Sequence, residues 1–157
     1  MLLRSLILLL FLLSSPFLKA GNLTIELANG DSVSLSYEEL AAMPSQTFTT
    51  HLPWYEGVNT FTGVRLENLL LHYTSEGVPD RINVRALNDY AVDISGEDIS
   101  AYHPVLTYLK NGQKMKIRDK GPYWLIYSLE DYPEIDKSQY HSQMVWQVES
   151  IKIIGND

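Results

Sequence analysis

Four histidines, His51, His72, His103 and His141, are the side chains best suited to acid–base chemistry or metal binding. Their spacing predicts no metal site, because a zinc-type centre needs at least three convergent ligands. His72 falls on the polar flank of a predicted helix and His103 precedes a proline, so both are expected to be structural or solvated. His51, near the end of a predicted strand, and His141, in a predicted loop, could each donate a hydrogen bond to a ligand.

The sequence shows no recognisable motif of a catalytic nucleophile. It contains no cysteine, which excludes thiolate catalysis, zinc–thiolate sites and disulfides. A Ser–His–Asp hydrolase would need a G-x-S-x-G turn or an equivalent, and none is present. We therefore expect no catalytic residue and no metal site.

The first twenty of the 157 residues have the pattern of an export signal. Arg4 gives a positive start, residues 6–13 are almost wholly apolar, and Pro16 ends the run. The apolar run is short of the ~20 residues that a membrane span needs. We expect cleavage after Ala20, a mature domain at residues 21–157, periplasmic localisation and no insertion of the mature chain into a membrane.

The predicted mature chain is acidic. Without Arg4 and Lys19, ten basic and nineteen acidic side chains remain, a formal charge of about −9. Nucleic acids and anionic lipids bind basic surfaces, so neither is an expected partner.

Alternating apolar and polar residues predict a domain made mostly of short strands. Ser36 and Glu39 have the spacing of a capping box, and leucines 66, 69 and 70 with Tyr73 have helical spacing. Strands are predicted at residues 23–27, 33–35, 46–52, 82–86, 90–94, 105–109, 114–117, 123–127 and 145–154, the last with a bulge near residues 149–150. Helices are predicted at residues 36–42, 66–73 and 97–102, which makes the fold class α+β and mostly β.

Several short motifs occur in a characteristic order. Trp54 precedes Phe-Thr-Gly-Val-x-Leu at residues 61–66 and paired leucines at 69–70. An Asn-Asp-Tyr turn follows a strand at residues 88–90, and a Lys-Asn-Gly element occupies residues 110–112. Arg-Asp-Lys-Gly-Pro at residues 118–122 precedes an apolar strand, and Val-Trp-Gln lies at residues 145–147. In this order the motifs resemble the oxidoreductase molybdopterin-binding superfamily, which has the sulfite oxidase-type fold with mixed sheets and a few short helices.

The resemblance implies a scaffold without its metal ligand. The molybdenum-binding members of this superfamily place a cysteine four residues before the tryptophan that corresponds to Trp54, and this chain has Thr50 there. A neutral hydroxyl does not replace a soft thiolate, so we expect no molybdenum. The chain is more similar to small exported members that bind free pterins without metal and act as sensors for membrane-bound enzymes of cyclic di-GMP turnover.

That likeness implies a non-catalytic periplasmic protein with a non-covalent pterin. Its partner would be the periplasmic domain of a membrane-bound GGDEF/EAL protein. The alternative is a molybdenum-cofactor oxidoreductase or a subunit of one. A third possibility is a structural adaptor that has kept the fold and lost the pocket.

A pterin pocket needs an aromatic platform and polar groups that pair with the heterocycle. Trp54, in a loop, is expected to stack on the ligand, whereas Trp124 and Trp146 lie in strand patterns and are expected in the core. Asp89 is a candidate acceptor for the pterin edge, although turn aspartates usually bond their own backbone. Arg118 is the expected donor. The full predicted ligand set is Thr50, His51, Trp54, Asp89, Tyr90, Arg118, Lys120, Gly121, Tyr123, His141 and Ser142.

The acidic stretch at residues 130–136 is predicted to be a solvated loop. Its tyrosine and proline would also suit a docking surface for a partner protein.

Overall fold

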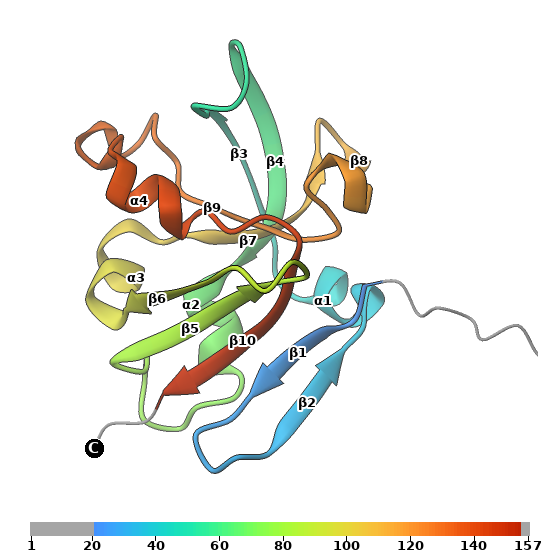
Figure 1. Cartoon of the computed structure of the whole chain (residues 1–157), viewed down its shortest axis with the longest axis vertical. Coiled ribbons are helices and arrows are strands. Elements are labelled where there is room, and N and C mark those ends of the chain that lie inside the picture. The colour runs from blue at the N-terminus through green and yellow to red at the C-terminus, as the bar shows by residue number, and fades with distance from the viewer. Residues whose placement is uncertain (1–20, 155–157) are drawn as a thin grey trace, which may run out of the picture.

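Two five-stranded sheets carry the fold, one below the other in Figure 1. They are seen in a computed structural model that describes residues 21–154. The predicted export signal, residues 1–20, lies outside the described residues.

The first sheet joins the two ends of the described chain. Its order is β2-β1-β10-β5-β6. The tight turn at Asn29 and Gly30 connects β1 to β2, and β1 pairs in parallel with β10. The strands are β1 (Leu23–Glu26), β2 (Ser32–Leu35), β5 (Arg81–Ala86), β6 (Ala91–Ser95) and β10 (Val148–Ile154).

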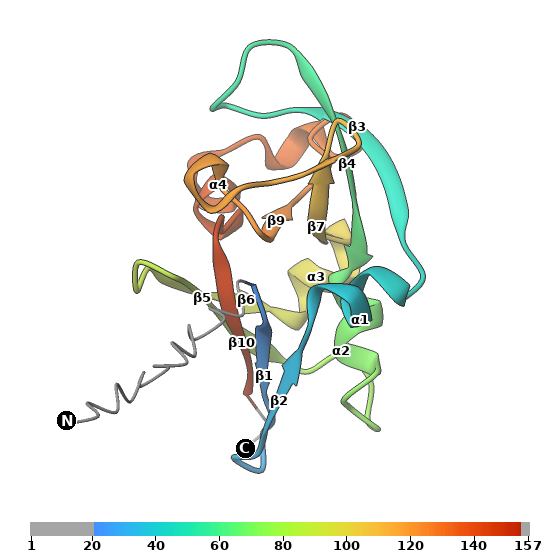
Figure 2. The ribbon, with the colours of Figure 1, turned by 90° about the vertical axis from the view of Figure 1, so that its right-hand side faces the viewer.

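The second sheet has the order β3-β4-β7-β8, and β9 also pairs with β7. The antiparallel hairpin of β3 and β4 projects at the top of Figures 1 and 2. The strands are β3 (Gln46–His51), β4 (Val58–Arg65), β7 (Val105–Lys110), β8 (Gln113–Lys114) and β9 (Trp124–Ile126).

Short helices connect the strands: α1 (Tyr37–Ala42), α2 (Leu66–Leu71), α3 (Gly96–Tyr102) and α4 (Ser138–Gln143), with 3₁₀ turns η1 (Ile117–Asp119) and η2 (Pro133–Ile135). The predicted capping box at α1 is confirmed: Ser36 Oγ accepts from the Glu39 amide, and the Glu39 carboxylate accepts from the Ser36 amide. Two amide groups at this helix start, which the helix itself leaves unpaired, are thereby satisfied.

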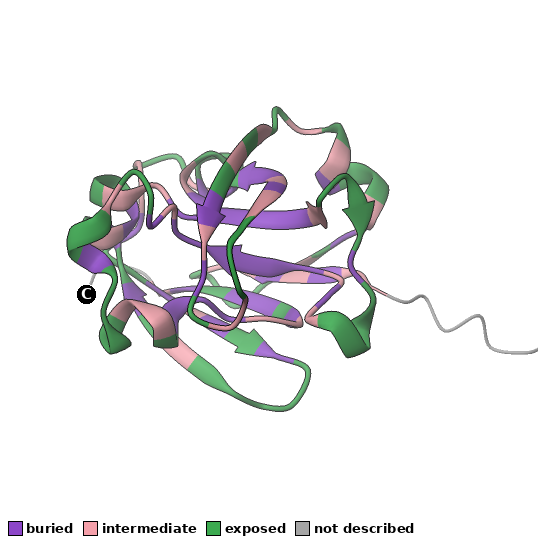
Figure 3. Cartoon of the chain, turned by 90° about the horizontal axis from the view of Figure 1, so that it is seen from above, coloured by how far each residue is buried: buried purple, intermediate pink, exposed green. Residues whose placement is uncertain are grey.

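The buried side chains form two clusters. The segments that carry buried residues are purple in Figure 3. The larger one fills the space between the sheets with aliphatic residues such as Leu66, Leu69 and Ile151. The smaller one is aromatic and includes Phe61, Trp124 and Tyr127. The smaller cluster supports the loops beyond β3 and β9.

Most predicted elements are present with shifted ends, and the predicted bulge in the last strand is confirmed as a register shift between Val148 and Ser150. The predicted strand at residues 114–117 is wrong, because pairing with β7 stops at Lys114 and the chain turns into η1. The last strand starts at Val148, not residue 145. The strand β4, the helix α4 and the two 3₁₀ turns were not predicted. The polar residues Asn59 and Thr60 interrupt the apolar–polar alternation that would predict β4. The helix α4 has no side-chain cap, so its start carries no sequence signal.

Candidate functional site

An apolar cavity of 330 Å³ lies where three chain segments meet. We call it the aromatic pocket. It is lined by Trp54, Ala86, Asn88, Tyr90, His141, Ser142, Met144, Val145 and Trp146. Four of these, Trp54, Tyr90, His141 and Ser142, belong to the ligand set predicted from the sequence.

Trp54 is held on the wall of this pocket by other rings. It follows the buried Leu52 in the loop between β3 and β4, and a Tyr55 N–H to Leu52 carbonyl bond closes that turn. The Trp54 ring stands edge-on to Trp146 with 5.3 Å between centroids and lies 5.8 Å from Trp124. Edge-to-face contacts of this kind fix a ring's orientation. Trp54 is only partly buried, so part of the ring remains accessible.

Tyr90 is placed by the turn between β5 and β6. The Ala86 amide donates to the Tyr90 carbonyl, and the Leu87 amide donates to the Gln147 carbonyl beside Trp146. The Tyr90 hydroxyl donates to the Ser142 carbonyl at 2.6 Å. This bond joins the turn to α4, so the two sides of the pocket are tied together.

A chain of charged and polar groups backs the pocket behind His141. Asp136 accepts from His141 Nε2 at 2.7 Å and contacts His51 Nε2 at 3.2 Å, and His51 Nδ1 lies 2.8 Å from Glu130. The hydrogen bond to Glu130, followed by the one to Asp136, raises the pKa of His51 above its usual value. The hydrogen bond with His51 lowers the pKa of Glu130, and those with His51 and His141 lower that of Asp136.

The acidic stretch is thus not a purely solvated loop. Two of its carboxylates carry this network, and Ile135 within it is buried.

Thr50 is enclosed by protein. Its side chain is fully buried, its hydroxyl donates to the His51 carbonyl at 3.1 Å, and it accepts from the amides of Leu129 and Glu130 at 2.9 and 3.3 Å. These bonds use the donor and both acceptor positions of a hydroxyl. A molybdenum centre held by a cysteine thiolate, as in the superfamily that the sequence resembles, does not fit this position. Thr50 offers neither a thiolate nor a free lone pair.

The other predicted ligand residues lie elsewhere. Tyr123 is fully buried, and its hydroxyl donates to the Gly21 carbonyl. The Asp89 side chain is 88% exposed and lies 3.7 Å from Arg85 Nη1. Arg118 and Lys120 line a different, cationic cavity. Gly121, which follows Lys120, is buried.

Five residues of the aromatic pocket were not predicted: Ala86, Asn88, Met144, Val145 and Trp146. The sequence places Trp146 in a strand pattern and hence in the core, but the strand starts two residues later and the ring is only partly buried. The Val-Trp-Gln motif at residues 145–147 was the sequence signal that could have identified Val145 and Trp146 as pocket residues. Trp124, in contrast, is fully buried as expected.

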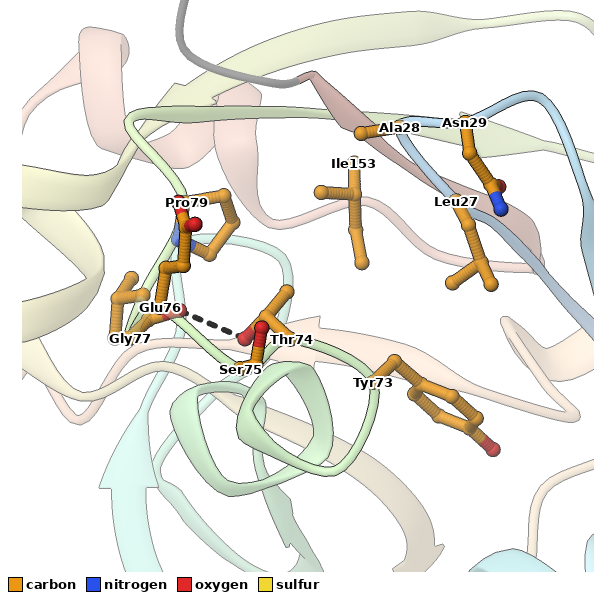
Figure 4. A pocket seen from close by; sticks show the side chains of 11 residues that line it. Leu27, Ala28, Asn29, Tyr73, Thr74, Ser75, Glu76, Gly77, Pro79 and Ile153 are labelled. Carbon is orange, nitrogen blue, oxygen red and sulfur yellow. Dashed lines mark hydrogen bonds between the residues drawn. The ribbon is translucent and has the colours of Figure 1, made fainter.

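A second cavity of 270 Å³ lies between the β1–β2 turn and the loop after α2 (Figure 4). In that loop the Thr74 hydroxyl donates to the Gly77 carbonyl at 2.7 Å. The cavity reaches Ile153 near the end of β10, whereas the aromatic pocket lies just before its start. It has one aromatic ring, Tyr73, and offers no stacking platform comparable with the aromatic pocket.

Within residues 21–154, no set of three or more His, Asp or Glu side chains is arranged to hold a metal ion. No helix in that range is long and apolar enough to cross a membrane.

Comparison with known proteins shows similarity at the level of the fold. No family profile matches the sequence, and no curated protein matches it in sequence. The crystal structure of the sulfane dehydrogenase SoxCD from Paracoccus pantotrophus matches with a TM-score of 0.65 and 14% identity. The match covers 88% of this chain, which spans 39% of that one. The predicted fold class, α+β and mostly β of the sulfite oxidase type, is confirmed.

Proposed function

We propose that this chain is a non-catalytic pterin-binding protein of the periplasm. The aromatic pocket is the observation that supports the proposal most directly. Three rings, Trp54, Tyr90 and Trp146, surround a cavity of 330 Å³. That volume is near the lower end of the ~300–1,000 Å³ usual for small-ligand sites and suits a flat bicyclic heterocycle better than a large dinucleotide cofactor.

The polar groups of the pocket suit a pterin as well. A pterin has a guanidine-like edge that donates and a ring carbonyl that accepts. His141 and Asn88 line the cavity and supply both kinds of partner. The Asp136 carboxylate bonded to His141 fixes the orientation of the imidazole.

In this proposal the ligand stacks against Trp54, His141 meets its polar edge, and no chemical step follows. The protein reports occupancy through contact with the periplasmic domain of a membrane-bound GGDEF/EAL protein. This reporting role rests on the family resemblance described above.

The decisive experiment is a fluorescence titration of the purified chain with a tetrahydropterin. We expect Trp54→Ala to weaken binding at least tenfold, which is about 1.4 kcal/mol. Tyr55→Ala is the matched control, because Tyr55 is the neighbouring ring and does not line the aromatic pocket. We expect its affinity to stay within twofold of the parent chain. If the parent chain binds no pterin in the titration, the proposal fails.

The reporting role needs a separate measurement. The purified periplasmic domain of a membrane-bound GGDEF/EAL protein from the same organism is tested for binding with and without the pterin. A pterin-dependent change in affinity supports the role, and binding that ignores the pterin contradicts it.

The second candidate is a molybdenum-cofactor oxidoreductase or a subunit of one. The fold shared with a sulfane dehydrogenase favours it. The enclosed Thr50 hydroxyl disfavours it, as described above. Elemental analysis separates the two functions, because this candidate requires one molybdenum per chain.

A further inference from the structure

The basic residues of this acidic chain are concentrated on one surface. Of the ten lysines and arginines after residue 20, five lie within residues 110–120, where Asp119 is the only acidic residue. Five basic and eighteen acidic residues remain in the rest of that region. The five are Lys110, Lys114, Lys116, Arg118 and Lys120.

These five side chains line one open cavity of 520 Å³, which we call the cationic groove. It is formed by the end of β7, by β8 and by the η1 loop, and Tyr55 also lines it. β8 lies at the right of Figure 1, across β4 and β7 from α4. The groove is therefore separate from the acidic loop that backs the aromatic pocket.

The positive charge of the groove is not neutralised from within. Arg118 has a carboxylate within reach, that of Asp119 at 3.7 Å. None of the salt bridges between residues 21 and 154 involves Lys110, Lys114, Lys116 or Lys120. The groove thus offers four lysine charges to an external anion.

Aromatic rings hold three of these lysines in place. The Lys110 ammonium lies 3.6 Å from the centre of the Tyr55 ring, and that of Lys114 lies 3.8 Å from the centre of Tyr37. Lys120 lies 4.5 Å from the centre of Trp146. Cation–π contacts of this kind restrict an otherwise flexible side chain, so less entropy is lost when a partner binds.

The η1 loop itself is also anchored. The Gln147 amide donates to the Lys120 carbonyl at 3.0 Å, and its side-chain amide donates to the Ile117 carbonyl at 2.6 Å. Gly121 allows the loop to close, because a Cβ there would lie 2.1 Å from the Met115 carbonyl oxygen. The charges therefore stand on a defined backbone.

We propose that the cationic groove is a docking surface for an acidic segment of a partner protein. Charge complementarity selects the segment, since carboxylates pair with the four lysines and are repelled by the acidic remainder of the surface. Several cations that line one open cavity match a series of carboxylates along a peptide. A nucleic acid or an anionic membrane would bring a much larger negative surface against the eighteen carboxylates outside the groove.

The test uses a fluorescein-labelled peptide of alternating Glu and Gly residues, with binding followed by fluorescence polarisation at low and at physiological salt. The groove variant is Lys114→Gln/Lys116→Gln/Arg118→Gln. The matched control, Arg81→Gln/Arg85→Gln/Lys152→Gln, removes the same charge from exposed positions on β5 and β10. We expect the groove variant to bind at least tenfold more weakly than the parent chain and the control less than twofold more weakly.

Three results would overturn the proposal: no binding of the peptide at physiological salt, equal losses in the two variants, or binding of vesicles rich in phosphatidylglycerol in preference to the peptide. Unfolding temperatures verify that both variants are folded. The proposal does not depend on the pterin, because the substituted residues lie outside the aromatic pocket. A chain that binds the peptide but no pterin would refute the proposed function alone.

Discussion

Thr50 shows how a single hydroxyl can hold two parts of the fold together. It lies at the end of β3 and accepts from the amides of Leu129 and Glu130, which follow β9. Because Leu129 is fully buried, water cannot replace the hydroxyl as the acceptor for its amide. The residue that the family resemblance marks as a lost metal ligand therefore has a structural task in this chain.

We predict that Thr50→Val lowers the free energy of unfolding by about 2–3 kcal/mol. Valine keeps the shape and the β-branching but leaves the buried Leu129 amide and the part-buried Glu130 amide without their acceptor. An unpaired buried donor costs about 1–3 kcal/mol. Thr49→Val is the control, because that neighbouring hydroxyl bonds only the exposed Thr60 hydroxyl across the strand pair. Urea unfolding measures both. Equal losses in the two variants would refute the role assigned to Thr50.

His51 is predicted to make stability depend on pH. Its pKa is raised in the folded state, so its contribution is complete below about pH 6.5, the ordinary histidine value, and is lost as the pH rises through the raised pKa. The pKa values of Glu130 and Asp136 are lowered, so their contributions are complete above about pH 4.5 and are lost as the pH falls through the lowered values.

The difference in unfolding temperature between the parent chain and His51→Gln should therefore be largest at about pH 5–6.5 and decrease on both sides. Thermal unfolding from pH 3 to pH 9 measures it. His72→Gln is the control, since His72 is exposed and its ring lies edge-on to that of Tyr73. A pH-independent difference for His51→Gln would show that the two ion pairs contribute nothing.

Among the elements, the contact of β4 with β7 depends on Gly63. A Cβ at this position would lie 2.2 Å from the Leu106 carbonyl oxygen and 2.5 Å from Thr107 Cα. The pairing of the two strands also shifts register between Thr62 and Gly63. The glycine of the Phe-Thr-Gly-Val motif is thus required by close backbone approach.

We predict that Gly63→Ala costs about 3 kcal/mol or more of stability, because backbone atoms of both strands must move apart. Gly57→Ala is the control. Gly57 has a φ of +69° with open space around it. The alanine there should therefore lower the free energy of unfolding only by the ~1–2 kcal/mol that the left-handed backbone conformation costs a residue with a Cβ. Urea unfolding compares the two. A smaller loss for Gly63→Ala than for Gly57→Ala would contradict the packing account.

The elements also explain which parts of the site were predictable. Local patterns specify the capping box at Ser36 and the bulge after Val148, since each depends on neighbouring residues. β4 was missed because it is stabilised by β3 and β7 on its two sides, which periodicity does not reveal. Sequence patterns are limited in the same way for the pocket. Residue type identified Trp54 and Tyr90 as pocket residues, but the sequence also placed Arg118 and Lys120 in the same site. Only the tertiary fold shows that these two line a different cavity.

At the scale of the whole molecule, the aromatic pocket and the cationic groove share a wall. Trp146 lines the pocket, and the Lys120 ammonium in the groove lies 4.5 Å from the centre of the same ring. Trp54 and Tyr55 are adjacent in sequence and line the pocket and the groove respectively. If both proposals hold, a pterin that contacts Trp146 changes the surroundings of a lysine that binds the partner.

This shared wall predicts energetic coupling between the two ligands. We expect saturating tetrahydropterin to change the affinity for the acidic peptide about fivefold, and the peptide to change the pterin affinity by the same factor, since coupling is reciprocal. Lys120→Gln should bring that factor close to one, because it removes the group that contacts Trp146. Lys114→Gln, which weakens the groove away from that ring, should leave the factor unchanged. Polarisation titrations with and without the second ligand measure the coupling factor in the parent chain and in both variants. If the two ligands bind independently to the parent chain, the two sites are not coupled.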